Sequence, residues 1–86
     1  MEYERLTGRR GFLEIAESVL LSVGEGKRKT HIMYAANLNW KQLSRYLGFL
    51  ERKGFIKHSD SNDVYELTDK GVRLLEVCRE LRKLLS

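Results

Sequence analysis

One stretch of the sequence, NLNWKQLSRYLGFLERKGFI, carries both the start and the stop signals of an α-helix. Asn39 is a favoured N-cap residue, and Gln42, three positions later, completes a capping box. Gly54 suits the left-handed position that follows a helix, and Phe55 can fold back onto the last turn as in a Schellman motif. The stretch therefore predicts a helix over residues 40–53, and the other elements have to be arranged around it.

Two further helices are predicted before this one. Apolar residues recur at helical spacing within residues 9–23, and glycines follow where that helix should end. Thr30 is an N-cap candidate for a short second helix, HIMYAA, which Asn37 can close in a left-handed conformation. Only about three residues then separate the second helix from the third, which is the spacing of a helix-turn-helix.

A β-hairpin and a last helix are predicted after it. The runs FIKH and VYELT contain β-type residues, and the turn formers SDSND lie between them. Tyr65 and Leu67 would share the inward face of the second strand. Thr68 is an N-cap candidate for a helix over residues 69–85 in which Val72 and Leu75 would face the domain core.

The order of elements predicts a mainly α fold with a small β-hairpin (α+β), the winged variant of the helix-turn-helix, with an extra C-terminal helix. A chain of 86 residues favours a single compact unit with a small core. We divide it into an N-terminal arm, 1–8, a winged helix-turn-helix DNA-binding domain, 9–68, and a C-terminal helix, 69–86, for dimerisation.

Positive charge is concentrated in the middle of the chain. Residues 27–58 hold eight basic residues against Glu51 alone, a net charge of +7, whereas residues 59–86 hold five basic against six acidic residues, a net charge of −1. Such a distribution is expected for a protein that binds a polyanion. A solvated basic surface is the alternative that charge alone leaves open.

A helical wheel divides the predicted helix 40–53 into a core face and a basic face. The core face is formed by Leu43, Leu47 and Leu50, flanked by Tyr46 and Trp40. The opposite face carries Lys41, Arg45, Gly48 and Arg52. Lys41 and Arg45 repel each other one turn apart, and Gly48 costs about 1 kcal/mol relative to alanine. Neither feature serves the core, but a polyanion against this face would account for both.

Double-stranded DNA is the polyanion that fits a helix of this kind, because an α-helix fits the major groove and its first turns reach the base edges. Arg45 or Lys41 can donate to guanine, and Gln42 can pair with adenine. At the start of the second helix, Lys29 and Thr30 can hold a phosphate. The candidate DNA-contacting residues are Lys29, Thr30, Asn39, Trp40, Lys41, Gln42, Ser44, Arg45 and Lys57. Phe49 lies near this face, and the N-terminal arm, a thymine methyl group and a second subunit are its open partners.

The run THIMYAANLNWKQLSRYLGFLERKGFI, followed by YELTDKG, resembles the archaeal winged-helix DNA-binding proteins, which include small dimeric chromatin-type proteins and predicted transcriptional regulators. The resemblance covers residues 12–77. It implies a winged-helix fold, double-stranded DNA as ligand, the third helix as the reading element, and dimerisation through the C-terminal helix. By position, the groove-facing slots of the motif are occupied by Lys41, Gln42, Ser44 and Arg45.

The sequence departs from that family in two places. The expected wing tip carries Asp60 and Asp63 and no basic residue, so Lys57 and His58 on the hairpin stem are its only candidates for DNA contact. The last helix is also shorter than the dimerising helices of the chromatin-type members, which puts a DNA-coating role in doubt.

The last helix has an apolar seam at coiled-coil-like spacing, made of Leu74, Cys78, Leu81 and Leu85. A helix that is apolar on two sides needs two neighbours, and the second is expected to be the same helix of another copy. The alternative is that its end folds onto the first helix within one chain. Cys78 is expected to be a small buried hydrophobic residue, with an intersubunit disulfide as the alternative.

Other classes of protein are not indicated. No nucleophile–base pair, phosphate-binding loop or metal-ligand spacing is found, so we expect no enzyme activity, no metal and no cofactor. The absence of an apolar run of about 18 residues and of a secretory signal, with a single cysteine, favours a cytoplasmic protein without a membrane span.

We therefore expect a homodimeric transcriptional regulator that inserts helix 40–53 into the major groove. Two other functions are kept. One is sequence-independent chromatin or architectural DNA binding. The other is a winged-helix protein-interaction module whose basic face docks an acidic partner.

Overall fold

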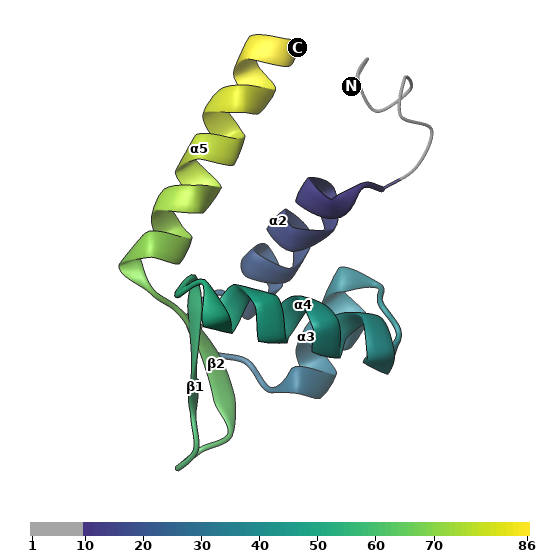
Figure 1. Cartoon of the computed structure of the whole chain (residues 1–86), viewed down its shortest axis with the longest axis vertical. Helices are drawn as coiled ribbons and strands as arrows, with labels where there is room; N and C mark the ends of the chain where they lie inside the picture. Colours follow the sequence, from purple (N-terminus) through teal and green to yellow (C-terminus); the bar gives the residue numbers. More distant parts are fainter. Residues whose placement is uncertain (1–9) are drawn as a thin grey trace.

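The structure is a computed structural model that describes residues 10–86, so the predicted N-terminal arm, 1–8, lies outside the described residues. Within them the elements follow the order α2 (Phe12–Val23), α3 (Lys29–Ala36), α4 (Trp40–Arg52), β1 (Ile56–Ser59), β2 (Val64–Leu67) and α5 (Asp69–Leu85). The hairpin and the C-terminal end of α5 lie at opposite ends of the molecule (Figure 1). The predicted mainly α fold with one hairpin and an extra C-terminal helix is confirmed.

Both ends of α4 are closed by the predicted local signals. The Asn39 side chain accepts a hydrogen bond from the backbone N–H of Gln42 at 2.8 Å, and the Gln42 side chain accepts one from the Asn39 N–H at 3.3 Å. At the C-terminal end the Phe55 N–H donates to the Leu50 carbonyl at 2.9 Å, and Gly54 has φ +82°. The helix therefore ends at Arg52, one residue before the predicted end.

The start of α3 differs from the prediction. The helix begins at Lys29 with Arg28 as N-cap, and no side chain caps it, so Thr30 lies inside the first turn and its assignment as N-cap was wrong. Its C-terminal end is as expected, because Asn37 takes the left-handed conformation (φ +56°, ψ +54°). Residues 37–39 then form the tight turn that leads into α4.

The core is formed where α2, α3, α4 and β1 meet. Its fully buried members are Ala16, Val19, Leu20, Val23, Ile32, Ala36, Leu43, Leu47, Leu50 and Ile56. The predicted core face of α4 is thus confirmed for its three leucines. Phe12, the first apolar residue of the predicted N-terminal stripe, is instead 54% exposed, because it lies at the first position of α2, beyond the core.

The hairpin pairs β1 with β2 in an antiparallel register that runs from Ile56–Leu67 to Ser59–Val64. Tyr65 and Leu67 pack against the core, as predicted. A third segment joins this sheet, since the N–H of Lys27 donates to the Tyr65 carbonyl at 3.0 Å and the N–H of Tyr65 donates to the Lys27 carbonyl at 2.8 Å. The sequence analysis missed this bridge, which ties the base of the hairpin to the segment before α3.

Gly71 determines how α5 leaves the hairpin. The Thr68 side chain caps the helix by accepting a hydrogen bond from the Gly71 N–H at 3.1 Å. A Cβ atom on Gly71 would lie 2.1 Å from the Phe55 carbonyl oxygen, so only glycine allows this approach. The face of α5 that packs against the domain is thus formed by Gly71, Leu74 and Leu75. The prediction for Val72 was wrong, because it points off that face and is 45% exposed.

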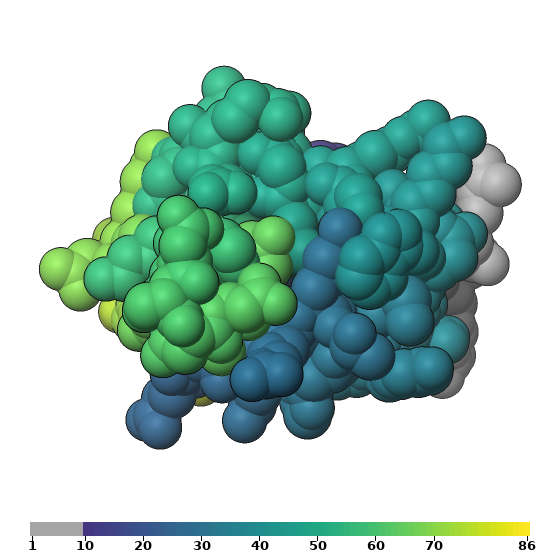
Figure 2. Space-filling view, turned by 90° about the horizontal axis from the view of Figure 1, so that it is seen from below, coloured from purple at the N-terminus to yellow at the C-terminus, as the bar shows by residue number. Residues whose placement is uncertain are grey.

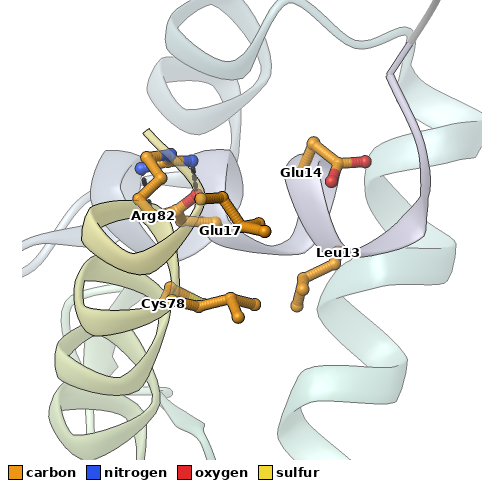
Figure 3. A pocket seen from close by; sticks show the side chains of 7 residues that line it. Leu13, Glu14, Glu17, Cys78 and Arg82 are labelled. Carbon is orange, nitrogen blue, oxygen red and sulfur yellow. Dashed lines mark hydrogen bonds and ion pairs between the residues drawn. The ribbon is translucent and has the colours of Figure 1, made fainter. Parts of the chain in front are cut away.

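The second half of α5 lies beside α2. Figure 3 shows Arg82 on α5 reaching the buried carboxylate of Glu17 on α2, to which its two terminal nitrogens donate hydrogen bonds. Cys78 lies one turn before Arg82 and is a free, buried thiol whose pKa is raised by burial. The prediction that Cys78 is a small buried residue is therefore confirmed. Cys78 packs against α2 of its own chain.

Candidate nucleic-acid interface

The basic face of α4 is exposed to solvent along the whole helix. Lys41, Arg45 and Arg52 are exposed, and none of them is ion-paired with a carboxylate of residues 10–86. Figure 2 shows the molecule from below, where the hairpin, the start of α3 and α4 share one surface. Arg52 belongs to this face by position, although the sequence analysis did not include it among the candidate contacts.

Gly48 lies in the middle of the face. A Cβ atom at this position would meet only the Arg52 side chain, at 3.1 Å from its Nη1 atom, and no backbone. No packing within the described fold therefore requires a glycine here, unlike at Gly71. A partner that approaches the backbone of α4 closely would require it.

Lys29 connects the starts of α3 and α4. Its Nζ atom donates a hydrogen bond to the Ser44 hydroxyl at 2.7 Å and lies 4.1 Å from the centroid of the Trp40 ring. The prediction that Trp40 flanks the core was wrong: Trp40 is 52% exposed, because its ring stands at the first helical position and contacts Lys29. The structure thus brings three of the candidate DNA-contacting residues together.

The capping box limits what two candidates can do. The side-chain oxygens of Asn39 and Gln42 are both bound to backbone N–H groups within the cap. Pairing of Gln42 with adenine uses both its amide oxygen and its amide nitrogen, so the oxygen would accept from adenine through its second lone pair while it also accepts from the Asn39 N–H. The capping box uses neither side-chain amide nitrogen, so the nitrogens of both residues are available to a partner. Thr30 is exposed in the first turn of α3.

The wing carries Lys57 exposed on β1, while its acidic tip is folded onto His58. The His58 Nε2 atom lies 2.9 Å from Asp63 Oδ1, and Nδ1 lies 3.1 Å from Asp60 Oδ1. The hydrogen bond that the His58 ring donates to the Asp63 carboxylate, aided by the charges of both carboxylates, raises the pKa of His58 above its ordinary value of 6.5. A protonated His58 offsets part of the negative charge that the sequence places at the tip.

Phe49 belongs to an aromatic cluster on the α2 side of α4. The Phe12 ring stacks on Tyr46 at a centroid distance of 5.5 Å and meets Phe49 edge-on at 5.2 Å. Together with Arg45 these rings line an open hollow at the edge of the basic face. Phe49 therefore packs on α2, which was not among its three open partners.

The predicted dimer seam on α5 is divided between two environments. Leu74 packs against the core and Cys78 is buried against α2, whereas Leu81 is 42% and Leu85 is 45% exposed. Val77 and Leu84 are exposed beside them, at 46% and 81%. The apolar surface that α5 leaves uncovered is therefore centred on its C-terminal half.

No helix within residues 10–86 is long and apolar enough to cross a membrane. No three histidine, cysteine, aspartate or glutamate side chains of the described residues gather as a group that could hold a metal ion.

Similarity to known proteins agrees with this geometry. Two uncharacterized proteins of Methanocaldococcus jannaschii are similar to the chain. The first is 38% identical over 79 residues, which cover 91% of this chain and 79% of the relative. The second is 48% identical over 58 residues, which cover 67% of this chain but only 26% of the relative.

Two crystal structures share the fold. That of Sso10a-2, a DNA-binding protein from Sulfolobus solfataricus, has a TM-score of 0.80 at 30% identity and covers 87% of this chain and 81% of that one. That of a MarR family transcriptional regulator from Silicibacter pomeroyi DSS-3 has a TM-score of 0.62 at 17% identity, over 98% of this chain and 65% of that one. A family model described as winged helix-turn-helix matches residues 9–86. With a matching family model, archaeal relatives and a hairpin wing behind its helix-turn-helix, the chain belongs to the winged helix-turn-helix family.

Proposed function

We propose that the protein binds double-stranded DNA by placing α4 in the major groove, and that it does so as a transcriptional regulator. The observation that carries this proposal is the unpaired cationic face of α4, where Lys41, Arg45 and Arg52 surround Gly48. DNA phosphates and base edges supply the acceptors that this face lacks within the described chain. The similarity to Sso10a-2, whose structure is described as that of a DNA-binding protein, supports the same partner.

The experiment is a fluorescence-anisotropy titration of a mixed-sequence duplex at several salt concentrations. We expect tight binding that weakens steeply with salt, and a large loss of affinity in Lys41→Ala/Arg45→Ala. The matched control is Arg79→Ala/Lys83→Ala, which removes the same charge from exposed positions of α5. Equal losses in both variants would show that α4 is not the DNA-binding face.

Absence of binding by the folded protein, even at low salt, would overturn the DNA proposal. The basic face would then be that of a protein-interaction module, which docks an acidic partner.

A second candidate function, sequence-independent architectural binding, is favoured by the capping box. The hydrogen bond from the Asn39 N–H holds the Gln42 amide oxygen towards the cap, whereas the cations of α4 are free to bind phosphates. Competition with unrelated duplexes separates the two functions. A regulator prefers its own site by a factor of about 10³ or more, whereas an architectural protein shows little preference.

We further propose that the protein acts as a homodimer through α5. Leu81, Leu84 and Leu85, with Val77, form an apolar surface that residues 10–86 leave exposed. Burying such a surface against the same helix of a second copy would give a two-fold arrangement suited to paired half-sites. Sedimentation equilibrium is expected to show a dimer for the wild type and a monomer for Leu81→Lys/Leu84→Lys. A wild-type monomer at high protein concentration would overturn this proposal.

A further inference from the structure

The ammonium group of Lys29 makes two contacts, and a further hydrogen bond joins the two residues that it touches. It donates to the Ser44 hydroxyl at 2.7 Å and lies over the Trp40 ring at 4.1 Å from the centroid. The Ser44 hydroxyl donates in turn to the Trp40 carbonyl at 2.8 Å. A lysine side chain at a surface is ordinarily free to rotate, but this one is fixed between the first turns of two helices.

The contacts leave part of the ammonium group unused. A lysine ammonium group has three N–H donors, of which the hydroxyl of Ser44 takes one and the ring face of Trp40 faces another. Lys29 is not ion-paired with a carboxylate in the described part of the chain. One donor and the full positive charge are therefore available to an anion.

The position of Lys29 indicates which anion it meets. In a helix-turn-helix the first of the two helices crosses the DNA backbone while the second lies in the groove. Lys29 is the first residue of α3, the helix on the backbone side, and it is half-buried beside the outward face of α4. Its ammonium group would thus lie nearer to phosphate than to base edges.

We propose that Trp40 is a positioning residue that presents the Lys29 ammonium group to one phosphate of the DNA backbone. This inference rests on the proposed function and assigns distinct roles to two residues of the candidate interface. Lys29 makes the contact, whereas the Trp40 ring holds it. Fixing the side chain before binding reduces the entropy lost when the contact forms.

A double-mutant cycle tests this division of roles, with duplex affinity measured over a range of salt concentrations. Lys29→Met should reduce the magnitude of the slope of log affinity against log salt concentration by about 0.9, because one phosphate contact is lost. Trp40→Leu should weaken binding roughly two- to fivefold, the range of an exposed cation–π contact, and leave the salt slope near the wild-type value. Trp40→Phe, which keeps a ring, should bind almost as well as the wild type.

The double variant shows whether Trp40 acts only through Lys29. If Trp40 acts only through Lys29, Lys29→Met/Trp40→Leu binds about as well as Lys29→Met alone. Effects that multiply would show that Trp40 touches DNA independently and would overturn the inference while leaving the proposed function intact. A wild-type protein that binds no duplex would overturn both.

Fluorescence of the free protein gives an independent readout. Trp40 is the single tryptophan of the sequence, so tryptophan emission comes from the ring that Lys29 contacts. Lys29→Met should shift that emission before any DNA is added, and Lys29→Arg should restore it. Unchanged emission in Lys29→Met would show that the contact does not hold in solution and would overturn the inference.

Discussion

Glu17 on α2 and Arg82 on α5 form the ion pair that joins the last helix to the rest of the fold. The Glu17 side chain is only 8% exposed, while that of Arg82 remains 38% exposed. A buried carboxylate without its partner loses the interaction that offset its removal from water. The pair therefore matters more for the direction of α5 than an exposed ion pair would.

Arg82→Met is expected to lower the free energy of unfolding by roughly 1–3 kcal/mol, because the Glu17 carboxylate would stay buried without this partner. Urea denaturation measures the change. Arg79→Met, an exposed substitution on the same helix, should stay within about 0.5 kcal/mol of the wild type. Glu17→Leu/Arg82→Met should recover part of the loss, since it removes the buried charge as well. Equal stabilities of Arg82→Met and Arg79→Met would contradict this role.

Gly48→Ala should separate stability from binding. Alanine is favoured over glycine in a helix by about 0.8–1.0 kcal/mol, and the new Cβ atom meets only the flexible end of Arg52. We expect a higher melting temperature together with weaker DNA binding, because the methyl group would stand between the helix backbone and the duplex. Thermal unfolding and anisotropy titration measure the two effects, and unchanged affinity would refute close approach at this position.

Gly71→Ala tests the opposite case, a glycine that packing within the fold requires. The added Cβ atom would overlap the Phe55 carbonyl oxygen, a backbone atom that cannot rotate away. A loss of about 1–3 kcal/mol or more in the free energy of unfolding is expected from this overpacking. Chemical denaturation of the two alanine variants side by side should therefore give shifts of opposite sign.

Leu47→Ala tests the orientation of α4. Leu47 is 2% exposed, so truncation should leave a cavity and cost roughly 2–5 kcal/mol of stability. Lys41→Ala, on the opposite face, should cost little. A neutral result for Leu47→Ala in urea denaturation would mean that the helix is turned differently about its axis.

The wing tip should respond to pH through His58. Its pKa is raised in the folded protein, first by the hydrogen bond with Asp63, so the protonated form stabilises the tip. That stabilisation is complete below the ordinary pKa of 6.5 and is lost as the pH rises through the raised value. NMR titration of the imidazole protons should give a pKa above 6.5 in the wild type, and a lower one in Asp63→Asn. Identical values in the two proteins would count against the ion pair.

The elements that sequence predicted well are those whose signals are local. The capping box and the glycine stop of α4 act within a few residues of each end, and the Thr68 side chain likewise caps α5, which begins at Asp69. The leucines of α4 follow one helical face, so their burial could be read from spacing alone.

The errors arose where distant residues decide the outcome. Thr30 has the chemistry of an N-cap, but α3 begins at Lys29 and its start is not set by a side-chain cap. Trp40 is large and apolar, yet it stands outside the core against Lys29. The bridge between Lys27 and Tyr65 joins residues that are far apart in the sequence, and no local pattern predicts it. Lys29, Ser44 and Trp40 are brought into contact, but the roles of the candidate DNA-contacting residues stay predictions.

That bridge bears on how the protein would fit a duplex if it binds DNA as proposed. Lys27 is hydrogen-bonded in both directions to Tyr65 on the hairpin, and α3 starts two residues later. Hydrogen bonds thus join the wing to the segment before α3, and the Lys29 contacts join the start of α3 to the first turns of α4. A duplex whose grooves do not fit the spacing between the wing and α4 would then have to deform, because the protein elements are tied to one another.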